Sequence, residues 1–484
     1  MEPGERDIHA PCREHIATLE AIVAAQQKLM EEQQRKIEAL EARLNQNSRN
    51  SSRPPSSDPP SAPAWPSKRP TGRKPGGQPG HEGHPRDLLP PAKVTRVTDV
   101  KPDRCGKCGR GLRGSDPDPL RHQVTELPPF VAQTEEWRLH ELVCGCGHRT
   151  RAALPEGVPP GASGPRLQAT LAYLTGVARL TKRPIEQVVK DLFGVRMSLG
   201  SIVAQQQAVS EAVAPAVEEA QEHAQAQNSG NADETGWKEG PKGGGEKGRK
   251  KAWLWVLVTR WVTVFLIHAS RGLEGAQALL GDFGGYLGTD RWGGYNGRDL
   301  RKRQMCWAHL IRDFVGFSER GKGSCEIGKL LLLETEKMFG LWHRVRDGTL
   351  ARSTFKGYMK PIRRRVEALL RKGTRCGESK TEGMCERILK VKPALWTFVR
   401  VEGVEPTNNV AERTIRHAVL YRKGCFGTHS EAGSRFVERI LTVVATLRQQ
   451  DRNVLDYLTE ACRRALVGKK PPSLLPGRAR EAAA

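Results

Sequence analysis

The sequence predicts an α/β protein in which a mixed sheet with a helical insertion follows several smaller units. Three observations lead to this fold class: a heptad pattern near the N-terminus, a Pro- and Ser-rich stretch after it, and β-rich apolar runs mixed with helical runs from residue 226 onward. A chain of 484 residues is too long for one compact core. We therefore expect six segments: 1–45, 46–92, 93–150, 160–225, 226–465 and a tail, 466–484.

The composition points to a polyanionic partner. Lys and Arg total 78 against 54 for Asp and Glu, a net charge of +24, and nucleic acid is the usual partner of so basic a chain. We find no apolar run long enough to span a bilayer, and the first ten residues do not read as a signal peptide. We expect a cytoplasmic, nucleoid-associated protein whose 11 cysteines are reduced or metal-bound.

Residues 15–45 carry a heptad repeat. Apolar residues seven apart form one seam, and a second seam is half apolar: Ile16, Val23, Met30, Ile37 and Leu44, then Leu19, Gln26, Gln33 and Leu40. This pattern predicts a coiled-coil helix within 1–45 and a homo-oligomer formed through it. The alternative is a single amphipathic helix that packs on its own protein.

Residues 46–92 are rich in Pro, Ser and Gly, and they predict an extended or disordered linker. Within it, Arg73 and Lys74 form a short basic piece that suits a narrow minor groove of DNA. A plain soluble spacer is the alternative.

Residues 93–150 predict a small DNA-binding unit that holds a structural zinc ion. Cys105 and Cys108 have the two-residue gap of a zinc knuckle, and Cys144 and Cys146 form a second pair with one residue between them. Four thiolates on Gly-containing turns match the tetrahedral ligand set of Zn²⁺. The shorter gap leaves the fourth ligand open, and His148 and His140 are further candidates. Four free thiols in a minor core are the alternative.

Residues 160–225 predict helices. A short helix over 184–192, a turn at Gly194 and a second helix capped by Ser198 have the proportions of a helix-turn-helix. An ordinary helical hairpin is the alternative.

The segment 226–465 contains the strongest fold signal. Strands are expected to end near residue 237 and to span 252–259, 262–268 and 285–290, with a helix at 273–280 before the last strand. Three strands, a helix and a fourth strand beside the first is the order of a ribonuclease-H-like domain. In that order Asp233 and Asp290 face each other across adjacent strands.

Carboxylates in this arrangement suit phosphodiester cleavage. Two Mg²⁺ ions roughly 3.5–4 Å apart stabilise the attacking and leaving oxygens, and Mg²⁺ prefers carboxylate ligands. A third acid is expected from a later helix. Glu412 lies in the first turns of such a helix, although a surface pair with Arg416 explains it equally well from spacing alone.

Two further stretches are rich in basic residues. An insertion at about 320–400 reads as helices, and its densest basic point is Arg363, Arg364 and Arg365. Arg422 and Lys423 precede an apolar helix. We expect both stretches to contact DNA phosphates, with a merely solvated face as the alternative.

Several motifs, taken in order, resemble the large transposase of the insertion sequence 66 family. Besides the heptad helix and the cysteine knuckles, they are Asn-Ser-Arg-Asn-Ser-Ser-Arg-Pro-Pro-Ser-Ser-Asp at 47–58, Gly-Gly-Gln-Pro-Gly-His at 76–81, Asp-Glu-Thr-Gly-Trp at 233–237, Thr-Asp-Arg-Trp-Gly-Gly-Tyr at 289–295, Cys-Trp-Ala-His-Leu at 306–310 and Asn-Asn-Val-Ala-Glu-Arg at 408–413. Each motif alone is weak, but their joint order is highly specific.

This resemblance implies a DDE transposase that binds the terminal inverted repeats of an insertion sequence, cuts there and joins the 3′ hydroxyl to target DNA. It implies the acid triad Asp233, Asp290 and Glu412, and small accessory proteins of the same element as partners. Cys306 and His309 match a pair that follows the second acid in similar transposases. We assign them an auxiliary role rather than metal ligation, with support of the core as the alternative. A DNA-binding regulator and a nuclease without strand transfer are the rival functions.

Overall fold

The computed structural model describes residues 10–51, 58, 80, 82, 87–240, 250–321 and 323–477. The chain divides into a larger unit, comprising 1–62, 135–191 and 195–484, and a smaller unit, comprising 63–134 and 192–194. The predicted DNA-binding residues Arg73 and Lys74 lie outside the described residues.

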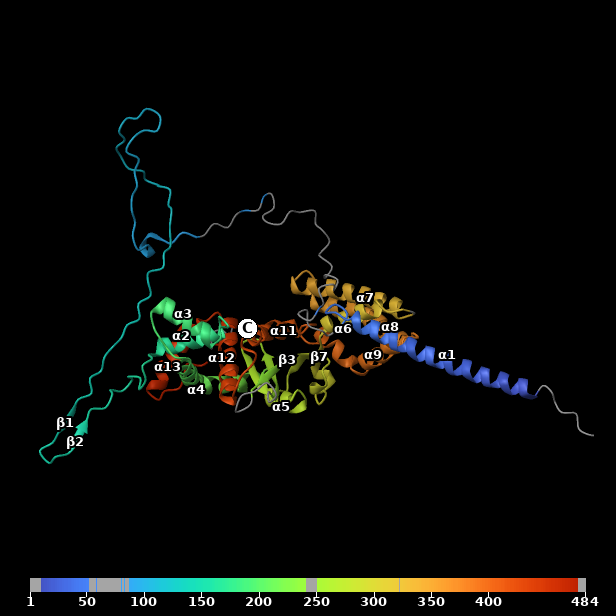
Figure 1. Cartoon of the computed structure of the whole chain (residues 1–484). Coiled ribbons are helices and arrows are strands. Elements are labelled where there is room, and N and C mark those ends of the chain that lie inside the picture. The colour runs from blue at the N-terminus through green and yellow to red at the C-terminus, as the bar shows by residue number, and fades with distance from the viewer. Residues whose placement is uncertain are drawn as a thin grey trace, which may run out of the picture. The chain divides into compact units, whose positions relative to one another are not determined.

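The larger unit is built on a five-stranded mixed sheet of order β5-β4-β3-β6-β7 (Figure 1). β3, β4 and β5 are antiparallel, whereas β6 and β7 run parallel to β3. The bounds are β3 Ser229–Glu239, β4 Lys250–Val258, β5 Thr263–His268, β6 Tyr286–Thr289 and β7 Arg303–Met305, with helix α5 Leu273–Leu280 before β6. The expected mixed α/β core, with its fourth strand beside its first, is confirmed.

The β4–β5 hairpin forms as the apolar runs predict. Arg260 and Trp261 make the two-residue turn, closed by a 2.9 Å hydrogen bond from the Thr259 amide to the Val262 carbonyl. Residues 254–258 are all buried, because helices cover both faces of the sheet there. β7 was not predicted, since three residues are too few to show a strand period.

Helix α12 covers the outer edge of the sheet. Edge strands expose unpaired amides, which proteins cover or block. Here the amides of Thr263, Phe265 and Ile267 on β5 donate to side chains of α12, namely Thr446 Oγ1 at 3.1 Å, Thr442 Oγ1 at 3.0 Å and Glu438 Oε1. These acceptors are four residues apart, so one face of the helix satisfies every second amide of the strand.

Further helices of the larger unit pack in one core with the sheet. They are α2 Pro165–Gly176, α4 Leu199–Gln225, α11 Asn409–Cys425, α12 Glu431–Gln449 and α13 Val454–Leu466. α3 spans Lys182–Phe193, Gly194 turns with φ +68°, and the Ser198 side chain caps α4 by accepting the Ser201 amide. The predicted helix, turn and cap are present, but α4 continues well past Val209 and buries one face against α12 and α13.

The insertion is helical, as predicted. It contains α6 Trp307–Ser318, α7 Gly323–Arg346, α8 Arg352–Gly373, α9 Ser379–Lys390, the turn η6 Lys392–Leu395 and α10 Thr397–Arg400. These elements have their own core, in which Trp307 packs on Trp396 and Trp342 on Phe398. Figure 1 shows them beyond β7, at the other end of the sheet from α12 and α13.

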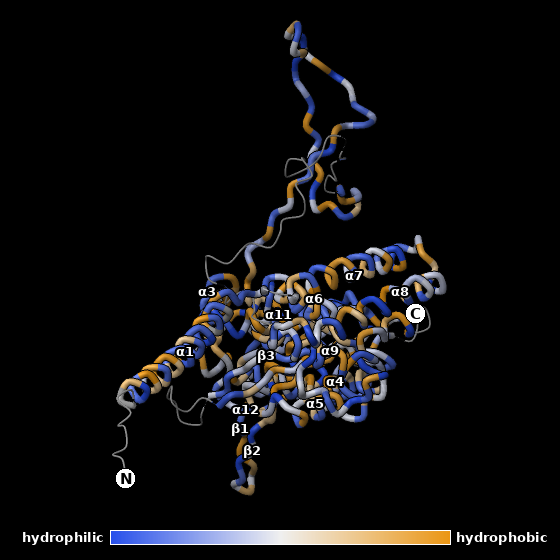
Figure 2. The backbone as a smooth tube through the Cα atoms, turned by 90° about the vertical axis from the view of Figure 1, so that its right-hand side faces the viewer, coloured by the Kyte–Doolittle hydropathy of each residue, from blue (hydrophilic) through white to orange (hydrophobic). Residues whose placement is uncertain are grey.

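The expected N-terminal helix is α1, Ala10–Leu44, and hydrophobic residues recur along it (Figure 2). The linker expected from residue 46 begins differently: Asn47 and Ser48 are buried in a turn, and the Ser48 amide donates to Asp58 at 2.7 Å. Asn50 donates to Glu319 at 2.6 Å. The polar side chains of residues 47–51 form hydrogen bonds within the protein, in place of the hydrogen bonds that a disordered linker makes with water.

The remaining elements are short. They are the turn η2 Pro91–Lys93 in the smaller unit, the turns η4 Gly293–Tyr295 and η5 Leu300–Lys302 between β6 and β7, and strands β1 Glu141–Val143 and β2 Arg149–Arg151, which form an antiparallel hairpin. In the predicted tail, Leu474 is fully buried, and Gln450 donates to its carbonyl at 2.7 Å. Within the described ranges, no helix combines the length and apolarity needed to cross a membrane.

Candidate active site

The sheet register brings the first two predicted acids together. β3 and β6 pair in parallel as Ser229↔Tyr286, Gly230↔Leu287 and Asn231↔Gly288, and the same offset places Asp233 beside Asp290. Asp233 lies in the middle of β3 rather than at its end, because β3 continues to Glu239 along β4. The Asp290 side chain accepts the Trp292 amide at 2.9 Å, which fixes the carboxylate just after β6.

Helix α11 places Glu412 next to β3. Asn408 stands at its N-cap position, where an asparagine commonly caps a helix, but its side chain makes no cap hydrogen bond. Instead its Nδ2 donates to the Ala232 carbonyl at 2.8 Å, and its Oδ1 accepts from Asn231 Nδ2 at 3.0 Å. The first turn of α11, which contains Glu412, is thereby attached to the strand that carries Asp233.

Asp233 is held in a strongly acidic environment. Burial raises the pKa of this half-buried carboxyl well above its usual range, and the nearby charges of Glu234, Asp290 and Glu412 raise it further. Carboxylates that crowd one another at a partly desolvated point favour either protonation or a bound cation. The oxygen donors of Asp233, Asp290 and Glu412 therefore fit a hard divalent ion.

Glu234 is a buried acid that sequence reasoning missed. Strand alternation turns it to the opposite face from Asp233, where its carboxylate accepts from the Tyr295 hydroxyl at 2.9 Å and pairs with Arg271 at 3.1 Å. Burial raises the pKa of Glu234 to about 7. The alternation of side chains along β3 could have indicated this acid, because it places Glu234 on the buried face of the strand. A buried charge there requires hydrogen-bond or ion-pair partners.

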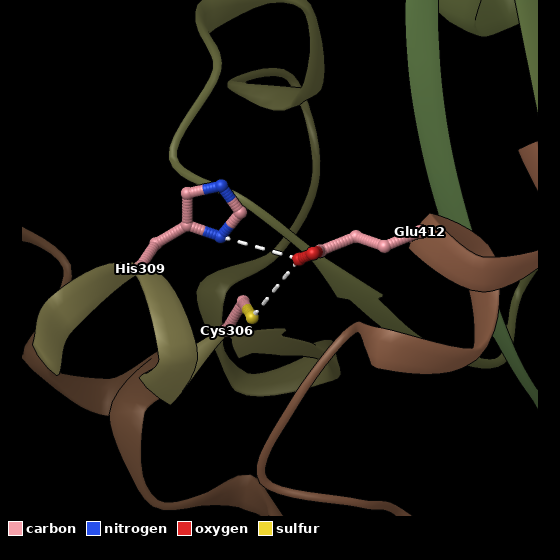
Figure 3. Close-up of side chains that lie close together, drawn as sticks. All are labelled: Cys306, His309 and Glu412. Atoms are coloured by element: carbon pink, nitrogen blue, oxygen red, sulfur yellow. Dashed lines mark hydrogen bonds and ion pairs between the residues drawn. The ribbon is translucent and has the colours of Figure 1, made fainter. Parts of the chain in front are cut away.

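Cys306, His309 and Glu412 meet at one point. Figure 3 shows the thiol and the imidazole, both from the start of α6, pointing toward the Glu412 carboxylate on α11. Glu412 Oε1 lies 3.8 Å from Cys306 Sγ and 3.6 Å from His309 Nδ1. Its Oε2 lies 3.8 Å from Arg312. The ion-pair partners of Glu412 therefore lie across the site rather than on its own helix.

Some of the predicted DNA-binding residues contact other parts of the protein, and others are exposed. Arg363 pairs with Glu367 at 2.9 Å, Arg365 pairs with Glu334 at 2.8 Å, and Arg364 is exposed. The Arg422 guanidinium donates to the Gly236 carbonyl and to Thr235 Oγ1, so it ties α11 to β3. The neighbouring Lys423 is exposed.

A basic pocket of about 280 Å³ lies against α8 and α10. Its floor is apolar and includes Trp396, whose buried Nε1 has no hydrogen-bond partner. Cationic side chains surround this floor: Lys356, Lys360, Arg363 and Arg400. Sequence reasoning singled out only Arg363 of these four, because the other three are spread over residues 356–400 and do not form a run.

Each cysteine pair forms a tight turn. At the first, the Gly109 amide donates to the Cys105 carbonyl at 2.9 Å, and amide hydrogen bonds from Cys108 and Lys107 lower the pKa of the Cys105 thiol. At the β1–β2 turn, the Cys146 amide lowers the pKa of the Cys144 thiol in the same way. Amides directed at sulfur favour thiolates, the form that binds metal. The two pairs belong to different units, so a shared zinc site stays a prediction.

Comparison with known proteins gives three similarities. Residues 160–435 match the family described as "Transposase IS66 family", and residues 1–87 match a family of unknown function. An uncharacterized protein of Sinorhizobium fredii, y4qI, is 24% identical over 244 residues. That match covers 45% of this chain and 44% of the relative, so the chain spans less than half the length of that relative.

Proposed function

This chain belongs to the IS66 family of transposases, and from that premise we propose that it cuts DNA at the ends of an insertion sequence and joins the freed ends to target DNA. The observation that carries the proposal is the β3–β6 register, which sets Asp233 beside Asp290, together with the attachment of the Glu412 helix to β3 through Asn408. Three acids from distant parts of the chain thus share one electrostatic environment.

We propose that Asp233, Asp290 and Glu412 hold two Mg²⁺ ions. Bound there, the ions supply Lewis acidity to the attacking and leaving oxygens of an in-line displacement. The charges of both other acids act on Asp233, which makes it the acid best suited to contact both ions. Water attacks the phosphorus and the 3′ oxygen leaves with a proton. The resulting 3′ hydroxyl then loses its proton as it attacks a target phosphodiester, and the target's own 3′ oxygen is displaced and leaves with a proton, so no covalent protein–DNA intermediate is needed.

The remaining modules are proposed to recognise and pair the element ends. α1 forms a zipper between two copies, the thiols of Cys105, Cys108, Cys144 and Cys146 hold a structural zinc ion, and α3 with α4 contacts the terminal repeats. The exposed apolar stripe of α1 and the knuckle geometry of each cysteine pair support this assignment. Small accessory proteins of the same element are proposed as further partners.

The test uses the full chain with labelled DNA that carries the element ends and a target plasmid, in Mg²⁺. We expect cleavage at the ends and a joined product. Asp233→Asn and Glu412→Gln should each lower cleavage by about 10³-fold or more while DNA binding persists, since they remove ligands but leave the basic surfaces intact. Asp282→Asn, at an exposed acid between α5 and β6, is the matched control and should cleave as the unaltered chain does.

The products separate the possible functions. Binding without any cut identifies a DNA-binding regulator, and a cut without joined product identifies a nuclease. Undiminished cleavage by Asp233→Asn contradicts the assigned acids.

A further inference from the structure

The point where Cys306, His309 and Glu412 meet has the donors of a second kind of metal site. A thiol sulfur, an imidazole nitrogen and a carboxylate oxygen all lie within 4.8 Å of one another. Across the described ranges, this is the one set of three or more such residues that converges so closely. A sulfur and nitrogen donor set suits zinc-class ions, whereas Mg²⁺ prefers oxygen alone.

The two separations measured from Glu412 are close to those around a tetrahedral ion. With Zn–S at about 2.3 Å and Zn–N or Zn–O at about 2.0 Å, tetrahedral angles put neighbouring donors about 3.3–3.5 Å apart. The observed separations from Glu412 Oε1 are 3.8 Å to Cys306 Sγ and 3.6 Å to His309 Nδ1. The thiol and imidazole donors lie within 4.8 Å of each other, so shifts of up to about an ångström close the site around an ion.

The surroundings fit ligands rather than core residues. His309 Nδ1 is buried and has no hydrogen-bond partner, although buried polar atoms normally have one. The Cys306 sulfur accepts a 3.2 Å hydrogen bond from the Asn408 amide, a contact of the kind that orients a metal-binding thiolate. Cys306 and His309 are three residues apart at the start of α6, so both side chains face α11.

We infer that Cys306, His309 and Glu412 bind a thiophilic divalent ion of the zinc class, and that this ion inhibits the Mg²⁺-dependent reaction. In this arrangement Glu412 Oε1 faces the thiol and imidazole while Oε2 faces Arg312, so an ion bound here withdraws the carboxylate from Asp233 and Asp290. The binding stands on the geometry alone, whereas the inhibition rests on the proposed function. The inference departs from the auxiliary role expected from the sequence.

Binding is tested with Co²⁺, whose thiolate complexes absorb strongly in the near ultraviolet. The full chain with Cys105→Ser and Cys144→Ser serves as the background, because the knuckle thiols are themselves proposed to bind such ions. We expect a thiolate band that Cys306→Ser abolishes and that His309→Gln weakens about ten-fold or more in affinity. Cys462→Ser, at another buried cysteine, should leave the band unchanged.

A band that persists in Cys306→Ser overturns the site, and so does one that His309→Gln leaves at full affinity. Circular dichroism confirms that each variant is folded. If Cys306→Ser does not fold, His309→Gln decides the question alone.

Regulation is tested by adding Zn²⁺ to Mg²⁺-supported DNA cleavage by the unaltered chain and by Cys306→Ser alone, so that the knuckle cysteines stay in place in both. Half-inhibition should need about ten-fold more Zn²⁺, or more, in Cys306→Ser than in the unaltered chain, each measured against its own zinc-free rate. Equal zinc sensitivity overturns the regulatory part. If the unaltered chain cuts no DNA under any condition, the proposed function fails, while the Co²⁺ spectra still decide whether the metal site exists.

Discussion

The Asn408 side-chain amide donates to the main-chain carbonyl of Ala232 across 2.8 Å, and this contact joins the helix of Glu412 to the strand of Asp233. Asn408 is almost fully buried and also accepts from Asn231, while its own amide reaches the Cys306 sulfur. One residue therefore links the three segments that supply Asp233, Glu412 and Cys306.

Asn408→Ala should reduce catalysis more than folding. Loss of the side chain leaves the buried Ala232 carbonyl without this donor, so the free energy of unfolding should fall by about 1–3 kcal/mol. The first turn of α11 also loses its attachment to β3, and a displaced acid ligand should cost at least about ten-fold in single-turnover cleavage. DNA affinity should stay the same. The measurements are denaturant unfolding, DNA binding and single-turnover cleavage.

The control for Asn408 is a second asparagine at a helix start. Asn453 caps α13 by accepting the Asp456 amide, so Asn453→Ala should cost about 1 kcal/mol of stability without changing cleavage per folded molecule. If Asn408→Ala cleaves DNA as fast as Asn453→Ala, the link between α11 and β3 has no catalytic role.

The parts of this structure that follow from local pattern were predictable. The β4–β5 hairpin, α5 and strand β6, which ends just before Asp290, each show their period within a few residues, and the parallel placement of β6 beside β3 follows from their order. Glu412 was not fixed by spacing, because its position depends on contacts between segments more than 100 residues apart.

Long-range side-chain partners escaped prediction. Asn408 looks like a helix cap in the sequence, yet its amide binds a strand carbonyl 176 residues away. Cys306 and His309 lie on the same helix turn, a spacing that also occurs in ordinary core helices. Only the packing of α11 against this turn shows that both side chains face Glu412. Such contacts depend on tertiary packing between distant segments, and no local periodicity of the sequence indicates them.

The edge contact of Glu438 should make stability depend on pH. Burial raises the pKa of this carboxyl to about 7, although the Ile267 amide and Arg435 at 2.9 Å oppose the shift. The folded protein therefore binds a proton more tightly than the unfolded chain, whose Glu pKa is about 4.3. The contribution of Glu438 to stability is therefore fully present below that value and is lost as pH rises through 7, by up to about 3 kcal/mol.

Glu438→Gln should remove this dependence, because its amide oxygen still accepts the Ile267 amide and carries no titratable proton. The unaltered chain should lose stability relative to Glu438→Gln as the pH is raised from 4.5 to 7.5. Urea unfolding of both proteins at each pH measures this difference in unfolding free energy. Glu336→Gln, at an exposed glutamate of α7, is the control. A difference that is constant with pH contradicts the raised pKa.

The exposed stripe of α1 should mediate self-association. Ile16, Val23, Met30 and Ile37 are each about half exposed in the single chain, and pairing two copies removes this apolar surface from water. Val23→Glu combined with Met30→Glu puts two charges into the seam and should reduce the mass measured by light scattering to that of one chain.

The matched control for the α1 stripe carries the same charge change beside the seam. Ala17→Glu combined with Ala24→Glu places two glutamates seven residues apart on the neighbouring helix position and should preserve the oligomer. A mass equal to one chain for the unaltered protein contradicts the zipper, as does an oligomer that survives the seam charges.

The basic pocket on α8 should contact DNA phosphates in the assembled complex. Lys356 and Lys360 are exposed and stand four residues apart, so both can meet one strand beside the apolar floor at Trp396. Each phosphate contact releases counterions, and log Kd then depends on log salt with a slope of about 0.9 per contact.

Lys356→Gln combined with Lys360→Gln should therefore lower that slope by about 1–2 and weaken binding of every sequence to a similar extent, because phosphate contacts carry no base information. Fluorescence anisotropy at several salt concentrations measures both quantities. Lys469→Gln combined with Lys470→Gln removes the same charge from an exposed pair after α13 and should leave the slope nearly unchanged. If both double variants lower the slope equally, the effect comes from the change in net charge. The pocket is then not a specific site of DNA contact.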